Sequence, residues 1–397
     1  MRILVAGGGS GGHVTPVLAI LEALSQTQPD LQICFVCDKK FAPQARTILA
    51  RSSLPITLKT VQAGKLRRYY GVPLWKQLLD IPTVLLNIRD SFLIGIGLVQ
   101  SFLLLGKFKP AVVFGKGGFV CLPVGIATHW RKIPLVIHDS DAHPGLTNRV
   151  LAKWATAIAT GTPLENYNYD RTRSKYVGVP VATQFQPPTP EEQAALKKKY
   201  VSDPTHRLVT MVGGGLGAGS LNKAMLAIAP TLVKEGVEVI MVTGTLHGDA
   251  VTAELQQVLK DPADQRMYHV EPFVDAEKMA DILAAADAVV SRGGATAMAE
   301  LSALGKATVL VPSPHLTGGQ QLKNAKAFEE AGAVVLVEDT KLQKNSTILE
   351  HALLWILKNP ATQKTLQTHI LTFAKPQAAK EVAEMIIEAA GQGRSER

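Results

Sequence analysis

Two glycine-rich loops, one in each half of the chain, limit the possible folds more than any other feature of this sequence. The first, residues 7–13, follows the apolar run 3–6, and the second, residues 213–219, follows the apolar run 208–212. Glycines between a strand and a helix allow backbone N–H groups to approach a phosphate at the helix N-terminus. One such loop is common in α/β proteins. Two of them predict two Rossmann-like domains whose loops face an interdomain cleft.

Short apolar runs alternate with helical patterns along both halves of the chain, which is typical of parallel α/β sheets. At 397 residues the chain is also longer than a single core usually supports. The expected fold class is therefore α/β, with two doubly wound domains. The predicted strands are residues 3–6, 33–37, 111–114, 135–137 and 157–159 in the first half, and 208–212, 238–242, 268–270, 288–290, 307–311 and 333–337 in the second.

The alternation breaks at residues 177–190, where a proline-rich stretch can continue neither a strand nor a helix. This predicts a first domain at residues 1–184 and a second at 185–375. The remaining residues, 376–397, contain a helical pattern whose apolar face is formed by Val382, Met385, Ile386 and Ala389. The first domain is a candidate to cover that face.

Positive charge is concentrated in the first half of the chain. Residues 1–184 hold 21 Lys and Arg against 9 Asp and Glu, whereas the remainder holds 21 against 24, which gives the net charge of +9. A basic surface attracts nucleic acid, anionic lipid and phosphorylated substrates alike. The sign of the charge therefore does not choose among these partners.

The cysteines predict neither a metal site nor a disulfide. Cys34 and Cys37 form a C-x-x-C within a predicted strand, which places them on opposite faces, and no second pair exists to complete a zinc site. We expect buried strand residues and a reducing cytoplasm. The N-terminus enters a strand directly, without the pattern of a secretion signal.

Residues 91–106 form an uncharged, apolar stretch of sixteen residues. A membrane-spanning helix needs roughly 20 such residues, and two glycines and a glutamine interrupt this run. The sequence therefore does not predict a membrane span here.

His13 lies at the end of the first glycine-rich loop. Thr15 and Pro16 predict an N-cap and a first helical position, so His13 would precede a helix N-terminus, where partial positive charge disfavours the imidazolium. A neutral imidazole can act as a general base. The alternative is a histidine that only caps backbone groups or binds water.

The same loop also fits the G-x-G-x-x-G pattern through Gly7, Gly9 and Gly12, with Asp38 at about the distance of a ribose-binding carboxylate. A dinucleotide-dependent oxidoreductase is therefore an alternative. The histidine at the loop's end and the second glycine-rich unit, which a dehydrogenase does not require, argue against it.

Two further polar segments follow predicted strands in the second half. Residues 291–300 open a helix, and their backbone N–H groups with Arg292 could hold a diphosphate while Glu300 accepts hydrogen bonds from ribose hydroxyls. Residues 312–321 form a long loop in which Gln320 and Gln321 could bind sugar hydroxyls. The alternative is an ordinary glycine turn and solvated side chains.

Asp139 and Asp141 form a D-x-D of the kind with which some glycosyltransferases chelate a divalent metal. Such three-residue matches are common by chance, and the sequence shows no further ligands. We therefore predict no metal site, with helix N-termini and Arg292 neutralising a diphosphate instead.

Taken together, these motifs resemble the MurG family, the bacterial GT-B glycosyltransferases that add N-acetylglucosamine to lipid I. The similarity covers nearly the whole chain. The segments that carry it are GGGSGGHVTP (7–16), KGGFVCLPVGIA (116–127), HDSDAHPGLTNRVLA (138–152), VGVPV (177–181), VGGGLGAGSLN (212–222), EPFVDAEKMADILAAADAVVSRGGATAMAE (271–300) and HLTGGQQLKNA (315–325).

The resemblance implies that the second domain binds UDP-N-acetylglucosamine (UDP-GlcNAc). Val274 would contact uracil through its backbone, Arg292 and residues 293–297 would take the diphosphate, Glu300 the ribose, and the paired glutamines the sugar. The implied contact residues are Gly215, Val274, Arg292, Ala295, Thr296, Ala297, Met298, Ala299, Glu300, Gln320 and Gln321.

For the first domain, the resemblance implies a lipid-linked acceptor whose pyrophosphate is cradled by Ser10, Gly11 and Gly12, with His13 near the reacting centre. Transfer inverts the sugar's configuration and requires neither a metal nor another cofactor.

Three positions depart from the family pattern. Asp141 stands where the family usually has Asn, Gly215 where it commonly has Ser, and Ala182 where an Arg often follows G-x-P-V. A carboxylate beside acceptor phosphates would repel them unless it acts as a base or is paired. The base assignment is therefore shared between His13 and Asp141, with His143 a further candidate.

The resemblance also gives the basic first half a partner, an anionic membrane surface instead of nucleic acid. Residues 65–70 and 74–75, with the apolar stretch 91–106 and its flanking Arg89, Lys107 and Lys109, combine cationic and apolar groups. We expect a peripheral enzyme on the cytoplasmic face of the cell membrane. The alternative is a buried helix with a solvated basic rim.

The expected activity is transfer of N-acetylglucosamine from UDP-GlcNAc to lipid I, which gives lipid II for peptidoglycan. Another GT-B glycosyltransferase acting on a glycolipid is the nearest alternative. The oxidoreductase and a non-catalytic sugar-nucleotide-binding protein are the others.

Overall fold

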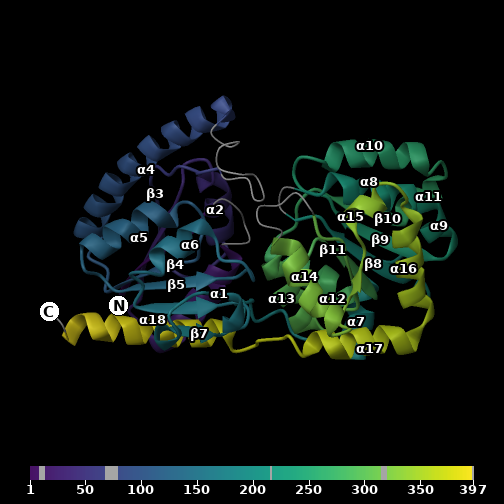
Figure 1. Cartoon of the computed structure of the whole chain (residues 1–397). Coiled ribbons are helices and arrows are strands. Elements are labelled where there is room, and N and C mark those ends of the chain that lie inside the picture. The colour runs from purple at the N-terminus through teal and green to yellow at the C-terminus, as the bar shows by residue number, and fades with distance from the viewer. Residues whose placement is uncertain (9–13, 68–78, 215–216, 314–319, 396–397) are drawn as a thin grey trace. The chain divides into compact units, whose positions relative to one another are not determined.

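The computed structural model of the chain describes residues 1–8, 14–67, 79–214, 217–313 and 320–395. Contacts within it divide the chain into two compact units (Figure 1). Unit 1 comprises Met1–Ala182 and Lys375–Arg397, and unit 2 comprises Thr183–Ala374. Unit 1 is thus discontinuous in sequence, because the last segment of the chain returns to it.

Unit 1 is built on a seven-stranded parallel sheet with the order β3-β2-β1-β4-β5-β6-β7. Its strands are β1 (Arg2–Ala6), β2 (Gln32–Cys37), β3 (Ile56–Thr60), β4 (Val112–Gly115), β5 (Leu135–Asp139), β6 (Ala157–Thr160) and β7 (Ser174–Tyr176). The five predicted strands are present. The two that the sequence did not predict, β3 and β7, are edge strands that lack a buried apolar run.

Helices cover both faces of this sheet. They are α1 (Thr15–Thr27), α2 (Ala42–Leu49), α4 (Ile81–Phe108), α5 (Cys121–Trp130), α6 (Leu146–Leu151) and α18 (Ala378–Ser395), with two single 3₁₀ turns at Leu164–Asn166 and Arg171–Arg173. The prediction of Thr15 as an N-cap is wrong by one position. Helix α1 already includes Thr15, and its N-cap is Val14, whose apolar side chain makes no cap hydrogen bond.

Helix α18 packs beside α1 and completes one face of unit 1 (Figure 1). Val382, Met385, Ile386 and Ala389, the apolar face read from the sequence, are buried in one core cluster. Val17, Ile20 and Leu24 of α1 belong to the same cluster. The C-terminal segment is therefore part of the hydrophobic core of unit 1.

Unit 2 is a second parallel sheet, with the order β10-β9-β8-β11-β12-β13. Its strands are β8 (Arg207–Val212), β9 (Val237–Val242), β10 (Tyr268–Glu271), β11 (Ala288–Ser291), β12 (Thr308–Leu310) and β13 (Val335–Leu336). All six overlap the predicted runs. The helices are α7 (Pro190–Lys197), α8 (Gly219–Ala227), α9 (Ala229–Lys234), α10 (Gly248–Val258), α11 (Pro262–Arg266), α12 (Ala276–Ala285), α13 (Ala295–Leu304), α14 (Gln320–Glu330), α15 (Asp339–Leu342), α16 (Thr347–Lys358) and α17 (Pro360–Leu371).

Cys34 and Cys37 lie on opposite faces of β2, as predicted, because they belong to the two different core clusters that flank the sheet. All three cysteines are free and buried. Burial raises the pKa of the Cys34 thiol to about 11 and that of Cys37 to about 12. Both are therefore inert core residues.

Helix α4 differs from the prediction. The apolar stretch 91–106 is only part of a helix of 28 residues, which begins after the N-cap Asp80 and ends at Lys109, whose φ of 50° is left-handed. Among the described residues, α4 is the one helix long and apolar enough to cross a membrane. Only 17% of its most apolar window is buried, so the alternative of a buried core helix is wrong.

Replacing Ile386 of α18 tests whether the C-terminal segment stabilises unit 1. Ile386→Ala removes a fully buried side chain, and the lost burial and the cavity left behind should lower the free energy of unfolding by about 2 to 5 kcal/mol. Urea titration measures this change. The exposed Glu388→Ala on the same helix should change it by less than about 0.5 kcal/mol; equal effects of the two substitutions would contradict the packing of α18.

Candidate functional site

The predicted functional segments of unit 2 lie at the carboxyl ends of four neighbouring strands. Strands β8, β11, β12 and β13 are adjacent in the parallel sheet. They lead into the second glycine-rich loop, residues 292–294, residues 311–313 and the start of α15, respectively. Ligands of doubly wound sheets bind at this edge, so the topology brings the candidate donor residues together.

The glycines of the second loop serve two purposes. A Cβ at Gly217 would lie 2.3 Å from the carbonyl oxygen of Thr243, so close packing against the end of β9 requires a glycine there. A Cβ at Gly214 would meet nothing within 4 Å, yet its φ of 80° is left-handed. The backbone at Gly214 thus has open space beside it. Gly215, a predicted contact, lies outside the described residues.

Arg292 is held by a buried carboxylate that the sequence did not predict. Its guanidinium donates to Asp339 Oδ1 at 2.6 Å, to the carbonyl oxygen of Val311 at 3.0 Å and to the hydroxyl of Ser220. Although desolvation opposes it, hydrogen bonds from Arg292 and Ser220 hold the pKa of the Asp339 carboxyl below its usual value. The Arg292 charge is therefore already shared with Asp339.

Helix α13 directs its N-terminus toward the same edge of the sheet. Its N-cap is Gly294, which provides no side-chain cap, so backbone N–H groups of the first turn are not bound by the cap residue. Of the predicted contacts on this helix, Met298 is buried, whereas Ala295, Thr296, Ala297, Ala299 and Glu300 are half-buried.

Glu300 lies in the second turn of α13. Desolvation by the surrounding protein raises the pKa of its carboxyl to about 8, well above its ordinary value of 4.5. Displaced carboxyl pKa values of this kind are typical of functional sites. Hydrogen bonds from a ligand's hydroxyl groups would replace the lost hydration of this carboxyl group and favour its charged form.

The other predicted donor contacts have defined positions. Val274 is buried among apolar side chains beyond the carboxyl end of β10, so only its backbone is available to the uracil of a nucleotide. Gln321 accepts a hydrogen bond through Oε1 from the backbone N–H of Ser313 at 2.9 Å. Gln320 begins α14, and its side chain lies outside the described part of the structure.

In unit 1, the described part of the candidate site is the turn after β5. Ser10, Gly11, Gly12 and His13 lie outside the described residues. Asp139 is buried, and burial raises the pKa of its carboxyl to about 6 although Tyr169 donates to its Oδ2 at 2.8 Å. Asp141 and His143 are half-buried on the same turn.

No group of three His, Cys, Asp or Glu among the described residues is placed to hold a metal ion. Asp38, the carboxylate of the dinucleotide alternative, is buried and accepts a hydrogen bond from the backbone N–H of Phe41 at 3.0 Å. Its other oxygen faces Gly8, where a Cβ would lie 3.3 Å away. Asp38 therefore packs against the start of the first loop.

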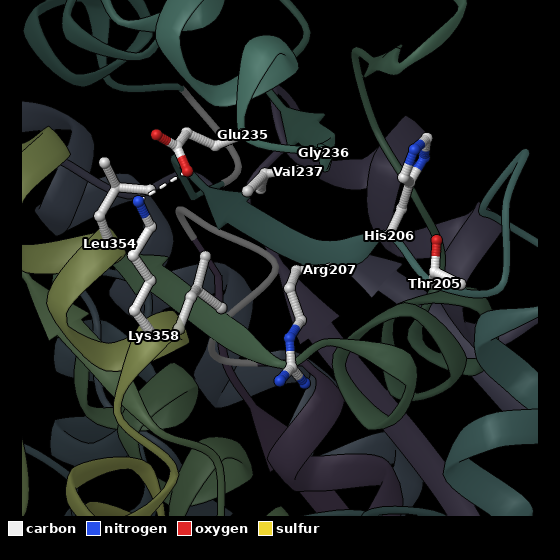
Figure 2. A pocket seen from close by; sticks show the side chains of 9 residues that line it. Thr205, His206, Arg207, Glu235, Gly236, Val237, Leu354 and Lys358 are labelled. Atoms are coloured by element: carbon white, nitrogen blue, oxygen red, sulfur yellow. Dashed lines mark ion pairs between the residues drawn. The ribbon is translucent and has the colours of Figure 1, made fainter.

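A pocket of about 350 Å³ in unit 2 lies away from all these residues (Figure 2). It is lined by the first residues of β8 and β9, Arg207 and Val237, and by Lys358, which pairs with Glu235 at 2.6 Å. The amino ends of parallel strands are the edge opposite the ligand-binding edge. This pocket is therefore not the donor site.

Comparisons with known proteins identify the family to which this chain belongs. The N-terminal domain of glycosyltransferase family 28 matches residues 3–160, and its C-terminal domain matches residues 208–382. The UDP-N-acetylglucosamine--N-acetylmuramyl-(pentapeptide) pyrophosphoryl-undecaprenol N-acetylglucosamine transferase of Desulforudis audaxviator is 33% identical over 397 residues, which cover 99% of this chain and 100% of the relative. The chain belongs to the MurG family of glycosyltransferases.

Two further matches agree with this membership. The transferase of the same name from Salinibacter ruber is 34% identical over 99% of this chain and 98% of the relative. The crystal structure of Acinetobacter baumannii MurG has a TM-score of 0.67 and 23% identity, covers 98% of this chain and 99% of that one, and shares the fold. The predicted MurG family, GT-B fold class and glycosyltransferase activity are confirmed, and the oxidoreductase alternative is excluded.

The raised pKa of Glu300 predicts a pH-dependent stability. Because the folded pKa of about 8 exceeds the unfolded value of 4.5, the contribution of Glu300 to stability is fully present below pH 4.5 and is lost as the pH rises through 8. Glu300→Gln resembles the protonated acid. It should match the wild type near pH 4.5 and be more stable, by on the order of 2 kcal/mol, at pH 8.5.

Unfolding free energies measured across this pH range check the prediction. Glu277→Gln, at an exposed position of α12, is the matched control and should leave the pH dependence as it is. A constant difference between Glu300→Gln and the wild type at all pH values would contradict the assigned pKa.

Proposed function

We propose that the chain transfers N-acetylglucosamine, with inversion, from UDP-GlcNAc to lipid I, the undecaprenyl-pyrophosphoryl-N-acetylmuramyl-pentapeptide, to give lipid II in peptidoglycan synthesis. The observation that carries this proposal is the full-length similarity, at 33% identity, to a relative named for this transfer. In the reaction, an acceptor hydroxyl attacks C1 of the donor sugar, UDP leaves, and a base takes the hydroxyl proton.

Unit 2 binds the donor in this proposal. The N-terminus of α13 and residues 293–297 hold the diphosphate, Glu300 binds the ribose, the backbone of Val274 meets the uracil, and Gln320 and Gln321 bind the sugar. The open space beside Gly214 and the glycine N-cap of α13, which makes no side-chain cap hydrogen bond, support this assignment. Arg292 contributes to the diphosphate site with a charge that it shares with Asp339, so backbone N–H groups carry more of the binding.

Unit 1 binds the lipid-linked acceptor, with Ser10, Gly11 and Gly12 at its pyrophosphate. The proton acceptor is His13 or Asp141, with His143 as a further candidate. The half-buried position of Asp141 on the turn after β5 supports its access to a substrate. No metal or other cofactor takes part.

We also propose that unit 1 docks on the anionic cytoplasmic face of the cell membrane through α4. The outward face of this helix is apolar: Ile81, Leu85, Ile88, Phe92, Ile96, Val99 and Leu103 recur at helical spacing, and all are exposed. The inward face is small or polar instead. A Cβ at Gly97 would lie 1.8 Å from the carbonyl oxygen of Gln62, and Asn87 exchanges two hydrogen bonds with the backbone of Arg67.

Basic side chains flank this apolar face. Arg89 is exposed, and Lys107 and Lys109 lie at the end of α4. Each basic residue near an anionic surface contributes about 1 kcal/mol to binding. Apolar area and positive charge together favour an anionic lipid surface, and nucleic acid is not proposed as a partner.

The central test is UDP release with UDP-GlcNAc and a lipid I analogue. The wild type should turn over in the presence of a chelator, and His13→Ala should lower the rate by about 10²-fold or more if His13 is the base. Glu300→Ala should lose most activity because the ribose contact is removed. Glu277→Ala, on the exposed face of α12, is the control.

The outcomes separate the alternatives. Undiminished turnover in both site variants would refute the assigned residues. Turnover with another glycolipid but not with lipid I would indicate the alternative GT-B activity. Binding of UDP-GlcNAc without UDP release with any lipid-linked acceptor would indicate a non-catalytic binding protein.

Vesicle co-sedimentation tests the docking of α4. Phe92, 73% exposed, contributes about 2 kcal/mol when buried, so Phe92→Glu should weaken binding to anionic vesicles at least about tenfold. Trp355→Glu makes the same change at an exposed aromatic residue of unit 2 and should have no effect. Equal binding of the wild type and Phe92→Glu would exclude α4 as the docking face.

A further inference from the structure

A buried lysine that the proposed mechanism does not use contacts the turn that carries Asp141. Lys116 follows the last residue of β4 and is 2% exposed. Its ammonium contacts Nδ1 of His138 at 3.0 Å and donates to the hydroxyl of Ser140. An ammonium buried in this way is tolerated only where hydrogen bonds and opposite charge compensate its lost hydration.

The hydrogen bonds of His138 fix its protonation state. Its Nε2 lies 2.9 Å from the carbonyl oxygen of Gly178, which can only accept, so Nε2 carries the proton. The Lys116 ammonium can only donate, so Nδ1 must be unprotonated. Burial and the Lys116 charge also hold the pKa of His138 well below its usual value. Two consecutive hydrogen bonds thus connect Lys116, His138 and Gly178, and they link the end of β4, β5 and the segment after β7.

The carboxylates whose charge favours the Lys116 ammonium are those of Asp139 and Asp141. Both carboxylates are on β5 or its turn, and Tyr167 and Tyr169 support the same turn through hydrogen bonds to the Asp141 carbonyl oxygen and to Asp139 Oδ2. Two acidic groups, Asp139 and Asp141, thus lie near a single buried cation, Lys116. The titratable groups that face Lys116 are His138, Asp139 and Asp141 from β5 and its turn, and Cys121 from α5.

We propose that Lys116 is a positioning residue for the acceptor half of the reaction: its ammonium fixes the turn after β5 through His138 and Ser140 and offsets the charge of Asp139 and Asp141. The inference rests on the proposed transfer to a pyrophosphate-linked acceptor. Without the ammonium, two carboxylates would stand near an anionic substrate, and their mutual repulsion would favour the protonated acids. A protonated Asp141 cannot take a proton from the acceptor hydroxyl.

The test compares Lys116→Met with Lys306→Met. Lys306 is also 2% exposed, but its ammonium donates to the carbonyl oxygens of Ala284 and Ala286 at the C-terminal end of α12 in unit 2. Both substitutions remove a buried ammonium and keep an unbranched side chain. They differ in whether the lost charge stood beside the turn that carries Asp141.

For Lys116→Met we expect kcat/KM for the lipid I analogue to fall about tenfold or more at pH 7, and the acidic limb of its pH profile to move about one pH unit higher. The Kd for UDP-GlcNAc should stay within about twofold, because the donor residues belong to unit 2. Lys306→Met should keep the acidic limb of the wild type. Ser140→Ala, which retains the ammonium, should also keep it.

A spectroscopic measurement tests the positioning without turnover. In ¹⁵N-histidine-labelled protein, the Nδ1 resonance of His138 should move in Lys116→Met and stay in place in Lys306→Met. If Lys116→Met does not fold, Lys116→Gln replaces it, with the same expected changes in the acidic limb and in the His138 resonance.

The failures are distinguishable. If the wild type releases no UDP with the lipid-linked acceptor, the proposed function fails. The wild type can instead turn over while Lys116→Met, or Lys116→Gln in its place, shows the same acidic limb and the same His138 resonance as Lys306→Met. In that case only the proposed role of Lys116 is overturned.

Discussion

The parallel arrangement of strands is the constraint on which the rest of this structure depends. In each unit every strand points the same way, so all strand-to-helix loops that follow a carboxyl end must meet at one edge of the sheet. Glycines, helix N-termini and polar side chains that are far apart in the sequence therefore lie at the same edge of the sheet. The segment 291–300 and the start of α15 meet in this way, because β11, β12 and β13 are neighbours.

This constraint also explains how much of the structure the sequence could predict. Central strands are buried on both faces and appear as continuous apolar runs, so all nine of them could be located, together with the edge strands β10 and β13. Edge strands such as β3 and β7 lack that signal. The full length of helix α4 was not predicted because Arg89 and Asp90 interrupt the apolar run, although Asp90 is buried and pairs with both Arg67 and Arg89.

The candidate site was predictable only in part, for a related reason. Glu300 and Asp141 stand within recognisable motifs, but the motifs do not show which side chains pair with one another. Arg292 pairs with Asp339, 47 residues away, and Lys116 contacts His138, 22 residues away. Asp339 belongs to no motif, and only the order and register of the strands determine that these side chains meet. The sequence therefore predicts the groups that would touch substrates better than the groups that hold them in place.

The two buried lysines show how position within the sheet decides what such a group does. Lys306 lies just before the amino end of β12, where carbonyl oxygens at the end of α12 accept its hydrogen bonds. The hydrogen bonds of the Lys306 ammonium are thus made within the protein, to groups that carry no charge. Lys116 lies at a carboxyl end, among groups whose charged forms are disfavoured by burial, namely His138 and Asp139. Placing ionisable groups at this edge costs stability through desolvation, and Glu300 in unit 2 is a second instance. Within each sheet, helix N-termini, backbone N–H groups and such side chains share one edge, so phosphates and hydroxyl groups of a substrate can interact with them there.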